Sequence, residues 1–359
     1  LTEALFPSLS TPDDFFLSGF ISSDVKESAV AFDIPILLYK DYKFKGLNYE
    51  YDSSNTIYTS FLSADEIRVN SLVANEIFMI STPFNNESKV RIEGVLNNKE
   101  SNSFEANLSY TLKDEKTIVD LSKFKINNQK VSWELNSENS GQFIFNSLSN
   151  SFNLEQVLIN NSDQNISLSG YFKSKNDYDF QIKTNNVLLQ DVLPEIENFE
   201  LKAKLDSEIS FYNTPLRNDS EVKMKFSNLN VNDIELGDLL VNSEGNTGLS
   251  SYRANASLQK GTEEQMNLSG GILVHDKRTT LNLDLKLNKM DMSFLSKLGK
   301  GKITEITSLL TGSFNLWGPL NNLSHSGNLT LDNFNMTVPY TNASYGLSES
   351  TKLTLSLIH

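Results

Sequence analysis

The strongest constraint on the fold is an alternation of apolar and polar residues that recurs from about residue 30 onward. The clearest run covers residues 281–287, where Leu occupies every odd position and Asn, Asp or Lys every even one. Because strand side chains point to opposite faces in turn, such a run forms a β-strand with one apolar and one polar face. Similar runs recur along the chain between Asn- and Ser-rich turns, at the spacing typical of antiparallel hairpins. The pattern predicts an all-β protein built from many short antiparallel, meandering strands.

Helical patterns are few and short. One candidate covers residues 291–299, where Phe294, Leu295 and Leu298 share a helical face and Asp291 is placed to cap the start. A second covers residues 188–193 and ends before a proline, and residues 1–9 form a third. Helices this short do not stand alone in water, so we expect them to pack against the sheet.

Charge and composition exclude several classes of function. The chain carries 31 Lys and Arg against 45 Asp and Glu, a net charge of −14, which disfavours nucleic acid as a partner. It contains no Cys, which excludes disulfides, thiolate catalysis and Cys-ligated zinc. No segment reaches the ~18–20 continuous apolar residues that a membrane-spanning helix needs. Because the sequence opens at Leu1 and closes in an apparent strand, we interpret it as a fragment.

No residue pattern predicts a catalytic or metal site. His275, His325 and His359 are far apart and lack metal-ligand spacing. Asp284 and Asp291 could be read as the carboxylate pair of a glycosidase, but both fall at outward positions of alternating runs. We therefore predict no enzyme activity, no bound metal and no cofactor.

An apolar motif recurs with a period of about 105 residues. It covers residues 119–126, 224–231 and 329–336, and its second apolar positions are separated by 226 − 121 = 105 and 331 − 226 = 105. The extra residue between the two halves of the motif predicts a β-bulge. Chance matching of alternating sequences is the alternative. A true repeat favours one continuous assembly over residues 1–359 rather than separate globules.

The segment 281–345 carries a family resemblance. It begins with an alternating strand and a short helical stretch, followed by Gly312 and a second alternating strand. A turn, Ser326-Gly327 and a third strand come next, and the segment then reaches Val338-Pro339-Tyr340. This order resembles the C-terminal region of the TamB family, the inner-membrane subunits of the translocation and assembly module, within the AsmA-like group. One departure is the turn, where Asn321-Asn322 stands in place of the family's Asn-Pro.

The resemblance implies a fold, a location and partners. It implies a fragment of the C-terminal half of an elongated, U-shaped β-groove with an apolar interior, crossing the periplasm from an inner-membrane anchor outside this fragment. The implied partners are phospholipid and an outer-membrane barrel of the TamA or BamA type. The implied function is bridge-like transport of phospholipid between the two membranes. The alternative is a scaffold for the assembly of outer-membrane β-barrel proteins.

Apolar side chains of the repeat and of the last strands are the candidate groove lining. An acyl chain gains about 0.8 kcal/mol for each CH₂ removed from water, so a continuous apolar track suits a lipid tail. In a closed sandwich or solenoid the same side chains would be packed core, and this alternative stays open. The candidate residues are Val119, Leu121, Phe124, Ile126, Met224, Phe226, Leu229, Val231, Leu281, Leu283, Leu285, Leu287, Phe314, Leu316, Leu329, Leu331, Phe334 and Met336.

Overall fold

The protein is nearly all β in the computed structural model, with 78% of residues in strands and 4% in helices. The described part of the chain has 24 strands in one long antiparallel sheet, which confirms the predicted all-β fold with few helices. The structure describes residues 9–55, 57–69, 72–84, 87–97, 101–128, 130–136, 138, 141–193, 199–215, 217–246, 250–275, 278–299, 304–347 and 349–355.

The chain forms two compact units. Unit 1 comprises Leu1–Ser162 with Leu168–Lys173, and unit 2 comprises Asp163–Ser167 with Ser174–His359. The strands of unit 1 are β1 (Leu9–Ser10), β2 (Phe16–Ser22), β3 (Glu27–Tyr39), β4 (Tyr42–Asp52), β5 (Ser60–Val69), β6 (Leu72–Phe84), β7 (Glu87–Leu96), β8 (Ser103–Lys113), β9 (Lys116–Asn127), β10 (Ser132–Leu135), β11 (Gln142–Asn146) and β12 (Ser151–Asn161). Residues of β13 (Gln164–Ser174) belong to both units.

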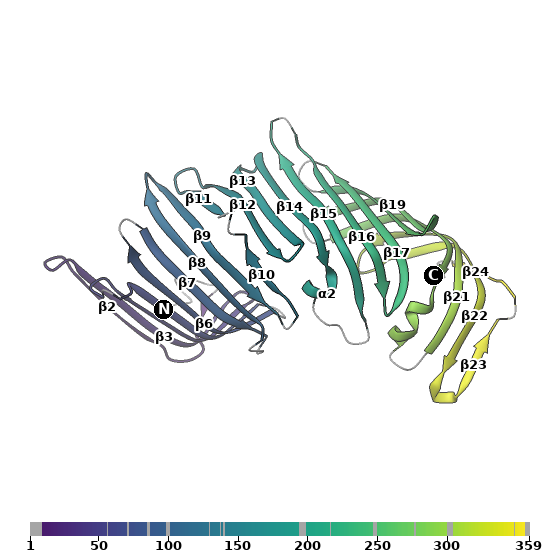
Figure 1. Cartoon of the computed structure of the whole chain (residues 1–359), viewed down its shortest axis with the longest axis horizontal. Helices are drawn as coiled ribbons and strands as arrows, with labels where there is room; N and C mark the ends of the chain where they lie inside the picture. The colour runs from purple at the N-terminus through teal and green to yellow at the C-terminus, as the bar shows by residue number, and fades with distance from the viewer. Residues whose placement is uncertain are drawn as a thin grey trace. The chain divides into compact units, whose positions relative to one another are not determined.

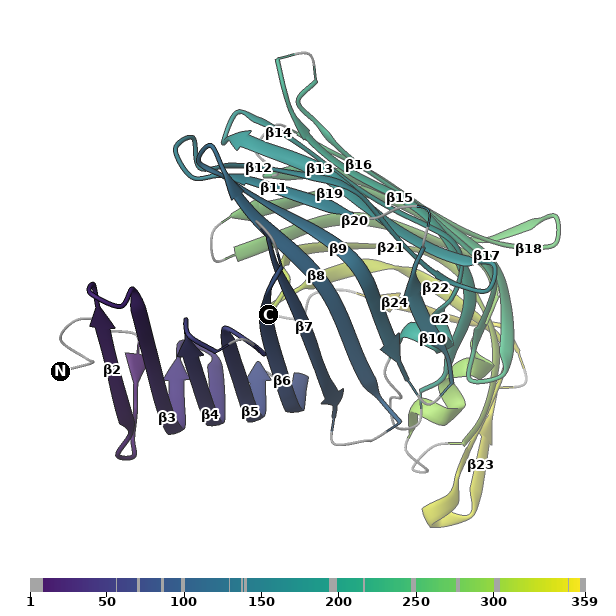
Figure 2. The same ribbon diagram turned by 60° about the vertical axis from the view of Figure 1, so that its left-hand side comes forward.

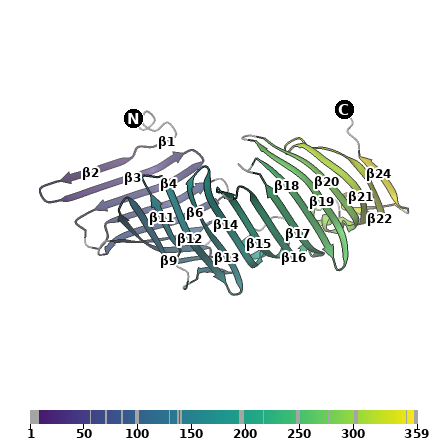
Figure 3. The ribbon, with the colours of Figure 1, turned by 90° about the horizontal axis from the view of Figure 1, so that it is seen from above.

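Unit 2 holds the remaining strands and the short helices. Figures 1 and 3 show β14 to β17 side by side in chain order. The elements are β14 (Asp177–Leu188), α2 (Leu189–Val192), β15 (Leu201–Asn213), β16 (Ser220–Val231), β17 (Ile234–Gly245), β18 (Ser251–Lys260), β19 (Glu263–His275), β20 (Arg278–Asp291), η2 (Ser293–Gly299), β21 (Thr304–Pro319), β22 (Ser324–Val338), η3 (Pro339–Thr341), β23 (Ala343–Gly346) and β24 (Thr351–Leu355).

Strand register in unit 1 aligns apolar residues across the sheet. Residues that face each other across an antiparallel pair share one face, so a chain of such pairs forms a row that crosses the strands. We call the following set the unit 1 row: Phe32, Tyr49, Leu62, Met79, Ile92, Ala106 and Phe124. Beside it, Leu47, Ala64 and Ile77 form the buried cluster of this unit.

Unit 2 carries a longer row of the same kind. We call the following set the unit 2 row: Leu205, Phe226, Leu239, Leu258, Met266, Leu287, Gly312, Leu329 and Leu353. It crosses β15 to β22 and ends on β24, and every member but Gly312 has an apolar side chain. In each unit, the face that carries the row is called the apolar face below.

Bulges keep the apolar residues on one face where the strict alternation breaks. The register shifts in β16 and β22 fall between the two halves of the repeated motif, as predicted. Asn228 and Asn333 take left-handed φ values of 55° and 54° there, a conformation that Asn tolerates. The Asn228 N–H is satisfied by Asp238 Oδ1 at 2.9 Å. β9, which carries the unit 1 copy of the motif, also shifts register against its partner β8 at this position.

Two short helices follow strands, close to where the sequence predicts them. α2 covers Leu189–Val192 within the predicted 188–193, and Figure 1 shows it at the end of β14. The other is a 3₁₀ helix, η2, which begins at Ser293 instead of at Asp291, because Asp291 still belongs to β20. The Asp291 carboxylate accepts the Ser293 N–H at 2.9 Å in an Asx turn that precedes the helix, so Asp291 stands one residue before the N-cap position. Of the third candidate, residues 1–8 lie outside the described part, and Leu9 belongs to β1.

Candidate functional site

The residues predicted to line a groove lie on the apolar face of the unit to which each belongs. All of them lie in described segments, and none is exposed: Leu229, Val231, Leu287 and Leu329 are buried and the others are half-buried. Register brings several together, since Leu283 lies opposite Leu316 and Leu285 opposite Phe314. The residues of 119–126 belong to unit 1, and all the others to unit 2.

The sequence-based selection omits much of the apolar face. It contains none of the unit 1 row before Phe124, and it omits Leu239, Leu258 and Met266 from the middle of the unit 2 row. The period-two pattern was the available signal, but small residues and bulges interrupt it in these strands. Gly270 in β19 illustrates this, because it takes an apolar-face position opposite Leu283 without adding a side chain.

One end of the apolar face in unit 2 is covered by the short helices. Leu189 of α2 belongs to the buried cluster formed with strands β15 to β18, and Phe294 of η2 packs against that cluster. Leu258, at 2% exposure, is the most buried leucine there. This end of the face is therefore protein core.

Polar contacts hold both helices against the sheet. The Gln164 side chain donates from Nε2 to Asp191 Oδ2 at 2.9 Å and accepts the Leu188 N–H at 2.8 Å, which fixes the start and middle of α2. The side chain of Asn232, in the β16–β17 turn, donates to the Phe294 carbonyl at 3.1 Å. Asn232 is itself 4% exposed.

Away from the helices, much of the apolar face of unit 2 is only half-buried, although Leu287, Leu310 and Leu329 form a second buried cluster. Val222, Met224, Leu268, Leu283 and Leu285 all retain intermediate exposure. At the end of the unit 2 row, Leu353 is 39% exposed. Half-buried apolar side chains in adjoining strands offer a continuous surface that could be wetted or covered by an apolar ligand.

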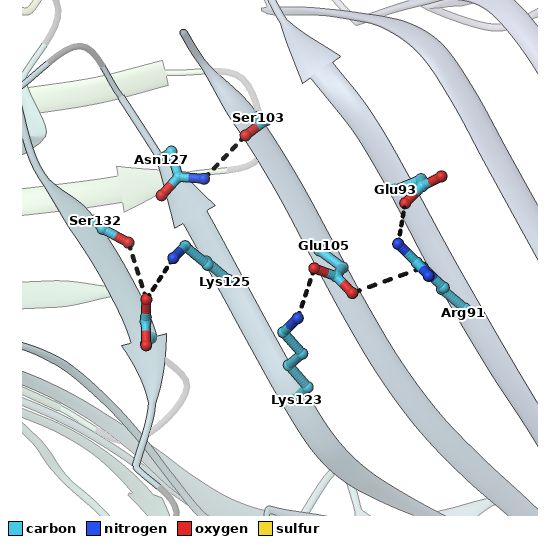
Figure 4. Close-up of polar contacts among 9 residues, drawn as sticks. Arg91, Glu93, Ser103, Glu105, Lys123, Lys125, Asn127 and Ser132 are labelled. Carbon is cyan, nitrogen blue, oxygen red and sulfur yellow. Dashed lines mark hydrogen bonds and ion pairs between the residues drawn. The ribbon is translucent and has the colours of Figure 1, made fainter.

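The opposite face is polar and carries ion pairs. Figure 4 shows this face on β7, β8 and β9, where Glu105 accepts from Lys123 at 2.7 Å and lies 3.6 Å from Arg91. Lys125 pairs with Glu134 at 2.6 Å on the neighbouring strand. The hydrogen bond from Lys123 lowers the pKa of Glu105, and that from Lys125 lowers the pKa of Glu134. Exposed pairs of this kind contribute little stability, and they identify the water-facing side of the sheet.

A hollow opens on the polar side between β18 and β19. It has a volume of about 470 Å³, and its lining includes Arg253, Asn255, Ser269 and Gly271. Gly271 contributes to the space because a side chain there would meet only the Tyr252 carbonyl oxygen, at 3.8 Å. The hollow combines one cation with neutral polar groups and with the apolar side chains of Ile272 and Leu273, and no carboxylate is among its lining residues.

Within the described residues, no three His, Cys, Asp or Glu side chains gather in a way that could hold a metal ion. Asp284 is exposed and accepts a hydrogen bond from Asn315, as its predicted outward position requires. His325 is exposed, whereas His359 and the side chain of His275 lie outside what the structure describes. Among the helices described, none has the length and apolar character to cross a membrane.

Comparison with protein families, with curated proteins and with solved structures gives no match for this chain. The resemblance to the TamB family therefore rests on the residues of segment 281–345 and stays a prediction.

Proposed function

We propose that the half-buried apolar faces bind phospholipid acyl chains, and that the protein carries phospholipid between the inner and outer membranes of a bacterial envelope. The observation that carries this proposal is the unit 2 row, in which apolar side chains follow one another from strand to strand. Each CH₂ of a tail that leaves water on such a surface contributes about 0.8 kcal/mol. Neighbouring positions along the row are chemically alike, so a tail can move between them without meeting one deep site.

The polar face supports the same proposal. Its ion pairs keep one side of the sheet in water, while a lipid headgroup would remain in solvent beyond the rim of the apolar side. No titratable side chain is required for this function, because it depends on shape and on wetting.

The test compares inward and outward charges in the same strand. Leu283→Arg and Leu331→Arg place a charge on the apolar face, and we expect each to abolish transfer of a fluorescent phospholipid between vesicles. Met336→Arg serves as a third inward variant. Asn282→Arg adds the same charge beside Leu283 but on the exposed side, and it should transfer lipid like the unchanged protein. Equal activity of the inward and outward variants would exclude the proposal.

Direct detection of the ligand is a second test. A photo-crosslinking amino acid at Leu285 or Leu331 should attach to phospholipid, and mass spectrometry of the purified protein should identify the same species. The same amino acid at Asp284, on the polar face, is the matched control and should capture none.

A second candidate function is assembly of outer-membrane barrels with a TamA or BamA-type partner. One observation favours it: among the described strands, β24 pairs only with β22, which leaves its other edge available for strand addition. Removing residues 351–359 should abolish this function and spare lipid transfer by the rest of the apolar face. Loss of barrel assembly on Leu283→Arg, with no loss on truncation, would argue against it.

A further inference from the structure

Strand β2 lies at the edge of the sheet in unit 1. It pairs with β3 from Phe16–Asp33 to Ser22–Glu27, and the registers of the described strands give it no second partner. Figure 2 shows it as the last strand beyond β3. A strand in this position presents a row of unpaired N–H and C=O groups that a further strand can complete.

The side chains of β2 lack the usual protection of an edge strand. Natural edges are commonly shielded by charged residues, proline or bulges. Between residues 15 and 23 the sequence has no charge and no proline. Large apolar side chains are exposed on both faces: Phe16 at 58% and Phe20 at 55% on the polar face, Leu17 at 64% and Ile21 at 87% on the apolar face.

The strand is complementary to itself. In an antiparallel pair centred on Ser18, Phe16 of one copy lies opposite Phe20 of the other, and this aromatic pair occurs twice by symmetry. Leu17 lies opposite Gly19, covering the position that has no side chain. Asp14, the nearest acidic residue before β2, falls opposite Ser22, so that no like charges meet along the strand.

We propose that β2 is a self-association site, at which a second copy of this chain adds by antiparallel β2–β2 pairing. The open backbone edge requires an extended partner strand, and the uncharged apolar side chains require an apolar one. The self-complementary register then favours a second copy. The pairing does not depend on lipid binding, but it would bring the apolar faces of unit 1 from two copies onto one continuous sheet.

Molar mass in solution tests the proposal. Light scattering of the purified chain should give a mass that rises with concentration from 40.3 kDa towards twice that value. Phe20→Lys and Leu17→Lys, each in a side chain that is exposed in the monomer, should weaken dimerisation by about 100-fold. Val25→Lys adds the same charge at a 63% exposed apolar residue in the β2–β3 turn, and it should leave the dimer intact.

A cysteine at the symmetry axis tests the register. The chain has no cysteine, so Ser18→Cys introduces a single thiol that should form an intermolecular disulfide under mild oxidation. Val25→Cys should not form one at the same protein concentration. A mass of one chain at all concentrations, a dimer that survives Phe20→Lys, or equal cross-linking of the two cysteine variants would each overturn the proposal. Far-ultraviolet circular dichroism confirms that each variant retains its strands.

Discussion

The two units share the same two-faced sheet but differ in what covers the apolar face. In unit 2, α2 and η2 lie on one end of that face, and Leu189, Leu229 and Leu258 are buried there. In unit 1 the described residues form no helix, and the buried cluster consists of Leu47, Ala64 and Ile77.

The difference shows that an apolar row is not in itself a core. Leu258 in the unit 2 row and Leu62 in the unit 1 row both lie between apolar neighbours in adjoining strands, yet the first is buried and the second half-buried. Strand pairing aligns side chains along one face but leaves their tips uncovered. In unit 2 the helices complete the burial of one end of the face, whereas in unit 1 Leu47, Ala64 and Ile77 are buried by neighbouring side chains of the sheet itself. Uncovered stretches stay available to a ligand.

The largest loss of stability should come from truncating Leu258, the buried residue of the unit 2 row. Leu258→Ala removes a 2% exposed side chain and should lower the free energy of unfolding by about 3–4 kcal/mol. Leu62→Ala, the matched change in unit 1, should cost about half as much because water already reaches that side chain. Denaturant unfolding followed by circular dichroism measures both. Equal losses would mean that the two rows are covered to the same degree.

The next largest loss of stability should come from substituting Gly312 in unit 2, with Gly271 as its control. At Gly312, which has φ +146°, a Cβ would lie 2.2 Å from the Asn328 carbonyl oxygen and 2.9 Å from Leu329 Cα. Gly312→Ala should therefore force strands β21 and β22 apart and cost about 2–3 kcal/mol, measured as a loss of thermal stability. Gly271→Ala is the control, since the site has room, and it should change stability by less than about 0.5 kcal/mol. A neutral Gly312→Ala would contradict the close approach of these strands.

Removing part of the helical cover should make the apolar face of unit 2 accessible, like that of unit 1. Phe294→Ala removes the η2 side chain that packs on the buried cluster, and it should cost about 1–2 kcal/mol. Binding of an environment-sensitive apolar dye should rise several-fold as the face below becomes accessible. Phe78→Ala on the polar face of unit 1, where Phe78 is already 41% exposed, should not raise dye binding. Unchanged dye binding by Phe294→Ala would show that η2 does not shield this surface.

The smallest effect should be the response of the polar face to acid. Hydrogen bonds from Lys45, Lys123 and Lys125 lower the pKa of Glu66, Glu105 and Glu134 below their ordinary value of 4.5. A depressed pKa in the folded state means stability that is present above pH 4.5 and lost as pH falls through the folded-state values.

Thermal unfolding between pH 5 and pH 2.5 measures this loss, which should shrink in high salt because the lysine of each pair reaches solvent. Glu134→Gln should remove part of the pH dependence. A stability that rises as pH falls through this range would contradict the assigned direction.

Much of the fold could be predicted from local pattern. Alternation at 281–287 predicted an apolar-faced strand, and the register of β20 with β21 places its leucines opposite apolar residues or glycine. The extra residues in the repeated motif predicted bulges, which the structure has in β16 and β22. The short helices were also visible, although Asp291 belongs to β20 and not to the helix.

The apolar face could be predicted only in part. Leu239, Leu258 and Met266 were missed because their strands combine apolar positions with Ala, Ser and Gly, which weakens the periodic signal. Their membership in the unit 2 row follows from register with β16 and β20, and register is set by turns and bulges in several strands together.

The sequence by itself determined that this chain forms two-faced strands in an antiparallel sheet, because side-chain direction in a strand alternates with every residue. Tertiary structure alone decided which apolar side chains become core and which stay half-buried. That division depends on contacts between segments far apart in sequence, such as the hydrogen bond from Asn232 to the Phe294 carbonyl, which lies 62 residues away. Alternation specifies a face, and packing in the folded chain, by helices in unit 2 and by neighbouring strands in unit 1, decides which parts of that face leave water.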